Sequence, residues 1–492
     1  MHMDFLDPRF RRRNRHRLVF VYIGGVLAVI ISTVLLVLAA NGYGVNTKTG
    51  EIVQNGLLFV KSQPSGAKVS FGNSSVKATT DARLVLPTNN YKLTLTKAGY
   101  RPWVRHFYLG QQTVVRLDYP LLVPLKPKVS TLNRYPVLPS VVGVTSDQRW
   151  LAVGGIDKHR AFLRVYDTND ASGTSTTIKL PAKLLSTTKA AESLNLIAWT
   201  NDNNFLLVRH DYGKSSEFLL INRSHADQSL NLNKYFKATP SQVSFRSGQA
   251  DQLLLYFAKQ RSLRVGDISS HSLAHSFLNQ VDAYQPLSSS LVLYSSLQPK
   301  RHRRVINVWE NGAIYTLARI NNLKGKLLFR GAQFQGQWYY AIGDSQSNFV
   351  NIYKNPLDSL RHPHPADLDA LESVKISDVN SLSFANKNRF VAAQNGRRVA
   401  VYDFDTSKIY TYSLNTPVSQ PLAWADDFRL SGNTNGQLFI NDFDGSNVYK
   451  LGSTSLPQGG YLSDNGQHLL TIGPAKNKQF QLVSLSLRAQ TK

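Results

Sequence analysis

Residues 423–447, which read AWADDFRLSGNTNGQLFINDFDGSN, contain the pattern that decides the fold of most of this chain. The small-aromatic pair Ala423-Trp424 precedes a polar turn and the short apolar strand candidate Phe428-Arg429-Leu430. A second strand candidate, Leu438 to Asp442, ends in an acidic, glycine-containing turn. Short apolar runs bounded by turn residues are typical of buried β-strands.

The same unit recurs eight times from about residue 140 to the end of the chain, and the strand pairs are listed below. The starts of the units lie about 37–55 residues apart, as expected of four-stranded propeller blades. A single blade buries too little surface to fold alone, so the units are expected to close into a ring. The first unit is weak, which leaves seven blades as the alternative to eight. The strand pairs are 150–153 with 163–167, 205–208 with 218–221, 253–256 with 263–267, 291–294 with 305–309, 338–342 with 349–353, 390–393 with 399–403, 428–430 with 438–442, and 468–472 with 480–483.

This repeat resembles the TolB-like or WD40-like propeller repeat of bacterial envelope proteins. Residues 438–447 and 461–466 fit its strand and turn patterns best, whereas the Gly-His and Trp-Asp signatures of WD40 repeats are missing. The resemblance implies a β-propeller over residues 140–492. Propellers serve both as enzymes and as binding platforms, so the resemblance predicts a fold and not a function.

A segment rich in proline and leucine, residues 120–139, precedes the repeats. Proline lacks a backbone donor and restricts the residue before it. We therefore expect an extended linker without regular strands, lying against a domain through its leucines and valines.

Residues 55–119 predict a small antiparallel β domain. Alternating segments such as Tyr91 to Thr96 are separated by turn residues such as Pro87 to Asn90. The domain resembles the PEGA family through Pro64-Ser65-Gly66-Ala67, through Leu86-Pro87 before Tyr91, and through the segment from Lys97 to Trp103. The resemblance implies an envelope β module and no reaction.

Three positions depart from the PEGA pattern. Ser65 replaces the glutamate of the name motif, Lys77 to Thr80 replace a Gly-x-Thr-Pro hairpin, and Asn90 stands where glycine is usual. Asparagine tolerates the left-handed conformation better than most residues, so Asn90 is compatible with the same turn.

A membrane segment precedes this domain. Leu18 to Ala40 comprises 23 residues without a charge, long enough to span a hydrocarbon core of roughly 30 Å. A cleaved signal peptide is the alternative, with Val37-Leu38-Ala39 as a permissive site, but its apolar region is normally only about 7–15 residues. Residues 1–17 form a basic tail and residues 41–54 a polar stalk.

The arginines of the tail predict the orientation of the helix. Flanking positive charge stays in the cytoplasm, so we expect the tail inside and the C-terminal domains outside the cell membrane. These orienting residues are Arg9, Arg11, Arg12, Arg13, Arg15 and Arg17.

The chain has 492 residues, a formal net charge of +26 and no cysteine. The absence of cysteine rules out disulfides, thiolate zinc sites and a cysteine nucleophile. The tail carries a local charge of +4, so +22 lies beyond the membrane segment. Such an excess favours polyanions as partners: lipid head groups, wall polymers or nucleic acid.

Two expected turns concentrate this charge. The run from Lys300 to Arg304 lies between two strands of one unit, and Arg397-Arg398 lies in the equivalent turn two units further on. Equivalent turns share a face of a propeller, so both could belong to one polyanion-binding patch; ordinary solvated turns are the alternative. Aromatic residues are absent around the run, which disfavours single-stranded nucleic acid. The candidates are Lys300, Arg301, His302, Arg303, Arg304, Arg397 and Arg398.

Evidence for metal or catalytic sites is weak. Asp442 and Asp444 have the close oxygen spacing of calcium loops, but the distal glutamate of such loops is missing. His362, His364, Asp367 and Asp369 match no standard site. The hydrolase and nucleotide-binding motifs HExxH, GxSxG and GxxxxGK[ST] are absent, and we predict neither catalytic residues nor a cofactor.

The sequence thus predicts a mainly β, non-enzymatic membrane protein whose propeller displays a binding or scaffold surface for an envelope protein or an anionic polymer. Two alternatives remain open. An extracytoplasmic propeller enzyme acting on glycan or peptide would need carboxylates or histidines in the central channel. A transmembrane sensor would need a cytoplasmic partner, because the 17-residue tail is too short for a signalling domain.

Overall fold

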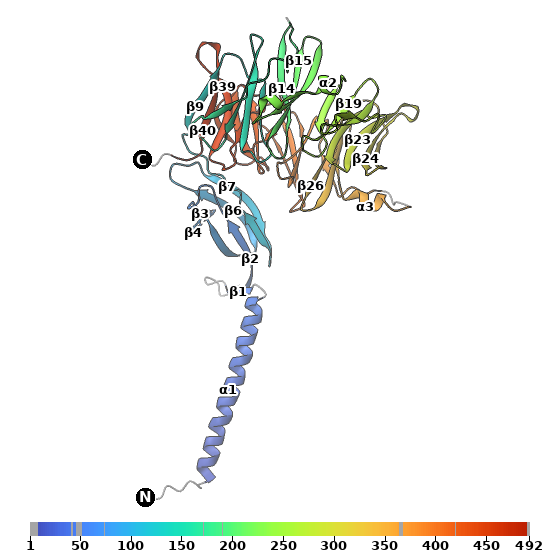
Figure 1. Ribbon diagram of the computed structural model, residues 1–492. Helices are drawn as coiled ribbons and strands as arrows, with labels where there is room; N and C mark the ends of the chain where they lie inside the picture. Colours follow the sequence, from blue (N-terminus) through green and yellow to red (C-terminus); the bar gives the residue numbers. More distant parts are fainter. Residues whose placement is uncertain are drawn as a thin grey trace. The chain divides into compact units, whose positions relative to one another are not determined.

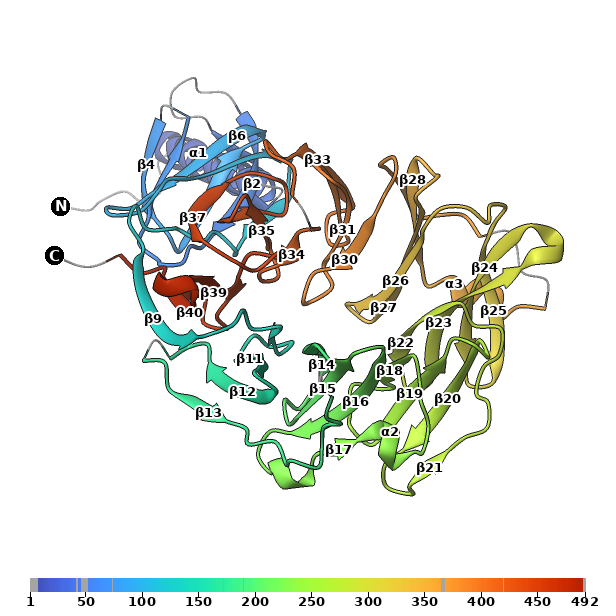
Figure 2. The same ribbon diagram turned by 90° about the horizontal axis from the view of Figure 1, so that it is seen from above.

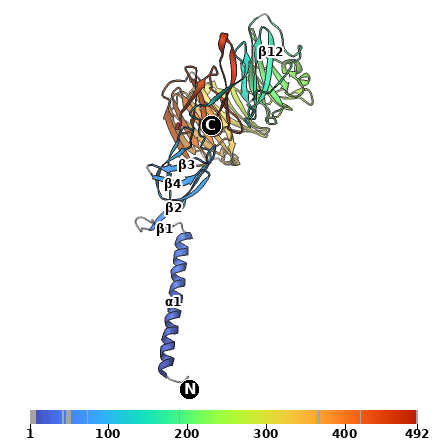
Figure 3. The ribbon, with the colours of Figure 1, turned by 90° about the vertical axis from the view of Figure 1, so that its left-hand side faces the viewer.

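The computed structural model describes residues 8–40, 43–45, 52–72, 74–170, 172–188, 190–363, 368–418 and 420–489. The chain divides into two compact units, Met1–Leu122 and Val123–Lys492. Helix α1 (Pro8–Ala40) opens the first unit and runs without interruption through the apolar segment (Figures 1 and 3). The arginines from Arg9 to Arg17 therefore lie on the first turns of α1.

Within α1, Leu18–Leu38 is long and apolar enough to cross a membrane. At about 1.5 Å per residue this stretch is roughly 30 Å long, the thickness of a bilayer core. Most of its large side chains are exposed in the structure, from Phe20 at 75% to Val19 at 47%. No described protein surface covers them, so the helix is compatible with a membrane anchor or with a signal peptide.

The rest of the first unit consists of two four-stranded sheets around a buried core that includes Leu58, Leu93 and Trp103. One pair, β2 with β8, is parallel, whereas the sequence pattern predicted an antiparallel domain. More than fifty residues separate these two strands, so no hairpin imposes an antiparallel direction on them. The end of the predicted stalk also joins this sheet, since β1 pairs with the start of β2. One sheet contains β1 (Tyr43–Val45), β2 (Ile52–Val60), β5 (Ala82–Pro87) and β8 (Val114–Leu117), and the other contains β4 (Ser74–Thr79), β3 (Lys68–Phe71), β6 (Asn89–Thr96) and β7 (Trp103–Leu109).

The second unit contains, among its described residues, eight four-stranded antiparallel sheets. We number them in chain order. The first to fourth sheets are β10 (Val141–Val144), β11 (Trp150–Asp157), β12 (Arg160–Asp167) and β13 (Ser175–Thr177); β14 (Glu192–Trp199), β15 (Phe205–Tyr212), β16 (Ser215–Asn222) and β17 (Leu230–Asn231); β18 (Gln242–Phe245), β19 (Gln252–Phe257), β20 (Ser262–Asp267) and β21 (Ser272–Leu273); and β22 (Ala283–Ser288), β23 (Leu291–Gln298), β24 (Arg303–Glu310) and β25 (Ala313–Ile320).

The remaining four sheets follow the same strand order. The fifth to eighth sheets are β26 (Leu327–Phe334), β27 (Gln337–Asp344), β28 (Phe349–Lys354) and β29 (Glu372–Lys375); β30 (Ser381–Phe384), β31 (Phe390–Asn395), β32 (Arg398–Asp403) and β33 (Lys408–Ser413); β34 (Ala423–Trp424), β35 (Arg429–Thr434), β36 (Gln437–Asp442) and β37 (Tyr449–Ser453); and β38 (Tyr461–Leu462), β39 (His468–Pro474), β40 (Phe480–Ser486) and β9 (Lys128–Tyr135). Short helices α2 (Leu232–Tyr235) and α3 (Pro356–Leu360) lie between strands.

The sheets pack face to face in a ring, which makes the second unit a β-propeller (Figure 2). Apolar clusters join neighbouring sheets, as Leu163 of the first sheet joins Leu219 of the second. The eighth sheet packs on the first through Ile472 and Leu151, so the ring closes. Because both faces of each sheet are covered, inner strands such as β19 (QLLLYF) are continuous apolar runs and do not alternate.

Strand β9 closes the ring. It comes from the N-terminal end of the unit and pairs with β40 from Tyr135↔Phe480 to Lys128↔Ser486. The prediction of a linker without regular strands over residues 120–139 is therefore wrong for Lys128–Tyr135. The strand can form because the eight residues from Lys128 to Tyr135 contain no proline. Pro127 and Pro136 lie just outside its two ends, where they do not interrupt its hydrogen bonds.

Candidate polyanion-binding face

The turns between the second and third strands of all eight sheets lie on one face of the propeller. Strands alternate in direction within each sheet, so these turns share a face with the connections from one sheet to the next. Contacts between sheets agree with this: Arg304, beside one such turn, hydrogen-bonds the connection at Asn322 and the end of β27 at Asp344. We call this surface the basic face, defined by residues 158–159, 213–214, 258–261, 299–302, 345–348, 396–397, 435–436 and 475–479.

The basic face carries nine lysine and arginine side chains and no aspartate or glutamate in its eight turns. All of these cations except the half-buried Arg261 are exposed. Among the residues that the structure describes, none of the nine lies within 4.0 Å of a carboxylate oxygen. The charge is therefore available to an outside anion. The nine are Lys158, Lys214, Lys259, Arg261, Lys300, Arg301, Arg397, Lys476 and Lys478.

The opposite face differs in both composition and pairing. Its turns carry several aspartates, among them Asp426, Asp427 and Asp464. Some of its cations are paired within the protein: Arg149 Nη2 lies 2.6 Å from Asp167 Oδ2, and Lys387 Nζ lies 2.8 Å from Asp427 Oδ2. The turns of the basic face therefore carry cations without carboxylates, whereas part of the charge on the opposite face is neutralised within the protein.

The two predicted basic turns both belong to the basic face. Lys300 and Arg301 lie in a short 3₁₀ turn, Pro299–Arg301, and His302 ends it in the left-handed conformation at φ 46°. Arg303 begins β24 and donates from Nε to Gln298 Oε1 at 2.7 Å. These residues project from the fourth sheet toward solvent.

Arg304, the last residue of the predicted run, does not belong to the exposed patch. It is 5% exposed, and its guanidinium lies 3.0 Å from Asp344 Oδ2. It also donates to the carbonyl oxygens of Asn322, Lys324 and Gly325 at 2.9–3.0 Å. Its alternation along β24 places the side chain inward, between the fourth and fifth sheets. Arg304 is a structural residue that joins two sheets, and the prediction that it binds a polyanion is wrong.

Arg397 and Arg398 lie at the turn between β31 and β32 in the sixth sheet. Gly396 supplies the positive φ of 51° that the turn requires. Both arginines are exposed, and Arg397 donates from Nε to the carbonyl of Leu414 at 2.8 Å. This bond orients the guanidinium and leaves its terminal nitrogens for a ligand. The intervening turn of the fifth sheet, residues 345–348, carries no charge.

Six cations of the basic face were not predicted from the sequence: Lys158, Lys214, Lys259, Arg261, Lys476 and Lys478. Each is a single cation or one of a spaced pair in a short turn, so no local charge run marks it. What they share is their position in the repeat: each lies in the turn between the second and third strands of its sheet. Aligning the eight repeat units by strand would have found them.

The predicted metal candidates are occupied by protein donors. Asp442 is 2% exposed and accepts from Asn447 Nδ2 at 2.8 Å. Asp444 accepts from the backbone and hydroxyl of Ser446 at 3.1 and 2.6 Å, as in an ordinary aspartate turn. Within the described ranges no three His, Asp or Glu side chains are placed to hold a metal ion. His364 and Asp367 lie outside the described residues.

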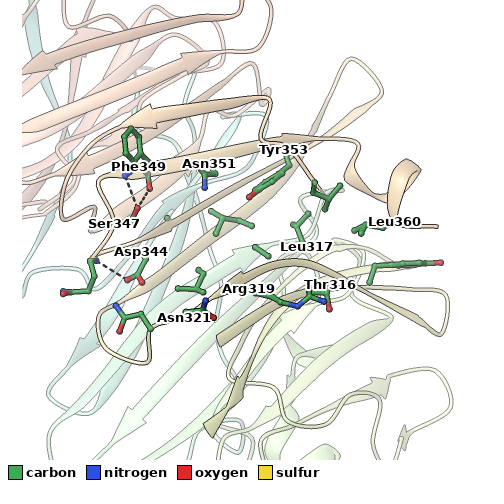
Figure 4. A pocket seen from close by; sticks show the side chains of 18 of the residues that line it. Thr316, Leu317, Arg319, Asn321, Asp344, Ser347, Phe349, Asn351, Tyr353 and Leu360 are labelled. Carbon is green, nitrogen blue, oxygen red and sulfur yellow. Dashed lines mark hydrogen bonds between the residues drawn. The ribbon is translucent and has the colours of Figure 1, made fainter. Parts of the chain in front are cut away.

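A cavity of about 970 Å³ lies between β25 of the fourth sheet and β27 and β28 of the fifth (Figure 4). Leu317, Phe349 and Tyr353 contribute apolar surface to it. Its charged lining residues among those described are Arg319 and Asp344, and Asp344 is already paired with Arg304. Among the described residues, no second carboxylate or histidine lines the cavity.

The second sheet contains a buried pair of titratable side chains, His210 and Glu217. His210 Nδ1 lies 2.9 Å from Glu217 Oε1, and the two side chains are 0% and 2% exposed. Burial favours a raised pKa for Glu217, but hydrogen bonds from His210, Ser186 and Asn231 outweigh it and lower the pKa to about 2. His210 and Glu217 lie opposite one another on β15 and β16, so the pair joins these two strands inside the sheet.

Comparison with known proteins identifies the small domain. Residues 55–122 match the model of the PEGA domain. They form a PEGA domain. This confirms the predicted resemblance and extends the domain by three residues, to the boundary of the first unit at Leu122. The PEGA domain covers only a small part of the chain.

Solved structures similar to this chain have low identity. An oligogalacturonate lyase from Vibrio parahaemolyticus is 9% identical, covering 75% of this chain and all of that chain, with a TM-score of 0.40. A structure of prolyl endopeptidases is 11% identical, covering 72% of this chain and 55% of that one, with a TM-score of 0.43. No curated protein matches the sequence. The assignment of the propeller therefore rests on its own eight sheets.

Proposed function

We propose that this chain is a membrane-anchored protein of the cell envelope whose propeller binds an anionic wall polymer through the basic face. The observation that supports this is the set of nine cations in six of the eight turns, because none of the eight turns contains a carboxylate. Stability does not require such an arrangement, because like charges on one surface repel one another. A polymer with a repeating phosphate or carboxylate could contact several turns at once.

In this proposal α1 anchors the protein, the arginine-rich start stays in the cytoplasm, and the PEGA domain and propeller lie outside. The uncharged 23-residue segment and the six preceding arginines support this orientation. The chain contains no cysteine, so a single introduced cysteine is a clean reporter. Ser269→Cys, at an exposed turn of the propeller, should react with a membrane-impermeant maleimide in intact cells, whereas Asp4→Cys should react only after lysis.

The binding test compares two faces of the same molecule. Lys476→Gln/Lys478→Gln removes two charges from the basic face, and Lys354→Gln/Lys408→Gln removes two from strand ends at the opposite face. The purified full-length protein, in a neutral detergent, is titrated with poly(glycerol phosphate). At about 1 kcal/mol for each cation near an anionic surface, the first variant should bind at least fivefold more weakly at low salt. The second variant should bind like the wild type.

Salt and competing polyanions complete the test. Binding should fall steeply as salt rises, because counterions are released from the polymer on binding. If both variants bound the polymer as tightly as the wild type, or if both lost affinity to the same extent, the basic face would not be the binding surface. If the protein bound phosphatidylglycerol vesicles or single-stranded DNA more tightly than poly(glycerol phosphate), the proposed wall polymer would be wrong. The ligand would then be a lipid surface or a nucleic acid.

A further inference from the structure

A second cavity, of about 560 Å³, opens where the ring closes, between β9 of the eighth sheet and the β11–β12 hairpin of the first. β9 and the residue after it contribute Arg134, Tyr135 and Pro136, and the hairpin contributes residues 157, 158, 160–162 and 164. The turn of that hairpin, 158–159, belongs to the basic face. The cavity has the volume typical of small-molecule sites, which is roughly 300–1,000 Å³.

Four cations line this cavity, which we call the seam pocket: Arg134, Lys158, Arg160 and Arg164. Asp157 is its single carboxylate. Among the described residues none of the four cations forms an ion pair within 4.0 Å, although Asp157 lies on the same wall. Three are exposed and Arg164 is half-buried, so they surround the opening at different depths. A net positive, unneutralised pocket favours an anionic group as its ligand.

The inner wall of the seam pocket is aromatic and rigid. The rings of Tyr135 and Phe162 stack with centroids 5.6 Å apart and an interplanar angle of 23°. Behind them the hydroxyls of Tyr135 and Tyr166 lie 2.7 Å apart, and Asn133 Nδ2 donates to the Tyr166 hydroxyl at 2.7 Å. These bonds hold the aromatic wall in place before a ligand arrives, which lowers the entropy lost on binding.

We propose that the seam pocket binds a single sugar residue carrying an anionic group, with the cations on its phosphate or carboxylate and Phe162 against its ring. This inference rests on the proposed function, because such a residue is a unit of the anionic polymer that the basic face attracts. Planar guanidinium groups bind phosphate and carboxylate through paired hydrogen bonds, and Arg134, Arg160 and Arg164 supply three of them. An aromatic face packs against the apolar face of a sugar ring.

The experiment uses the full-length protein in neutral detergent and isothermal titration calorimetry with glucose 6-phosphate, glucuronate, glucose and inorganic phosphate. Arg160→Gln/Arg164→Gln removes two charges from the pocket, and Lys476→Gln/Lys478→Gln removes two charges from the same face outside it. The pocket variant should bind the anionic sugars at least tenfold more weakly, whereas the second variant should bind them normally. Glucose should not bind measurably. Unchanged melting temperatures verify that both variants fold.

Phe162→Leu separates a sugar site from a bare anion site. This change should weaken the binding of glucose 6-phosphate several-fold and leave the affinity for inorganic phosphate unchanged. Equal losses in the pocket variant and the outer variant would overturn the proposal, because they would indicate general electrostatic attraction. If poly(glycerol phosphate) binds the basic face but neither anionic sugar binds, the seam pocket proposal fails and the proposed function stands. If Phe162→Leu has no effect and phosphate binds as tightly as glucose 6-phosphate, the sugar assignment fails.

Discussion

Replacing Arg304 by methionine should destabilise the propeller without affecting the exposed charges of the basic face. The change removes four hydrogen bonds, three to the carbonyls of residues 322, 324 and 325 and one to Asp344. It also leaves the Asp344 side chain, 5% exposed, with one remaining donor among the described residues, the backbone nitrogen of Gln346 at 3.2 Å. Breaking a buried ion pair in this way costs about 3–5 kcal/mol.

For a unit as large as Val123–Lys492, each kcal/mol lowers the melting temperature by about 2 °C, so we expect a loss of roughly 6–10 °C. Tryptophan fluorescence of the full-length protein in detergent measures it, since Trp309 of β24 and Trp338 of β27 lie in the two sheets that Arg304 joins. Arg303→Met is the matched control, because the Arg303 guanidinium donates one hydrogen bond within the described residues, to Gln298 Oε1. That variant should melt within about 2 °C of the wild type.

A double variant tests the cause. In Arg304→Met/Asp344→Asn the unpaired buried charge is removed, so the loss should be smaller than the sum of the two single losses. The reasoning would be refuted if Arg304→Met melted like the wild type and also weakened polymer binding as strongly as Lys300→Gln. Arg304 would then act as an exposed ligand of the polyanion and not as a buried structural residue.

Three further changes test the buried carboxylate Glu217, the core of the PEGA domain and the orientation of the chain in the membrane. The pKa of the Glu217 carboxyl group is lowered from 4.5 to about 2, which corresponds to about 3 kcal/mol of folding stability. This contribution is present above pH 4.5 and is lost as the pH falls toward 2. The difference in unfolding free energy between the wild type and Glu217→Gln, measured by urea unfolding, should therefore shrink over that range. Trp103→Ala should lower the unfolding free energy of the PEGA domain by about 3–5 kcal/mol, because the Trp103 side chain is fully buried and its ring lies 5.8 Å from that of Tyr119. In limited proteolysis, this variant should be cut first within residues 55–122. Replacing the six arginines between Arg9 and Arg17 by glutamine should produce inverted molecules, detected as protection of the Ser269→Cys reporter.

Local pattern was enough to predict the repeated sheets. Apolar runs such as Leu253-Leu254-Leu255 are recognisable because both faces of each sheet are buried, and the turns that separate them are rich in Asn, Asp and Gly. The PEGA domain was predictable for a related reason, since its turns need particular residues: Gly66 and Gly99 both have positive φ, at 76° and 83°. The apolar helix Leu18–Leu38 was predictable because its recognition depends only on length and the absence of charge.

Arg303 and Arg304 show where local pattern fails. The two residues are neighbours in one basic run, and side-chain alternation along β24 places one toward solvent and the other between two sheets. Which of the two is buried depends on the register of β24 with β23, where Arg304 lies opposite Leu297. A register is a property of the assembled sheet, so the charge run alone predicted two equivalent arginines.

The amino-acid sequence alone therefore decides the apolar N-terminal helix, the PEGA domain and the repeated strands, because each depends on contacts or conformations within a few residues. Folding in three dimensions decides the rest. β9 closes the ring by pairing with β40, about 350 residues away, and this pairing brings Arg134 beside Arg160 and Arg164 to form the seam pocket. The basic face likewise exists only because eight separate turns meet on one side of a ring, a relation that distance along the chain does not reveal.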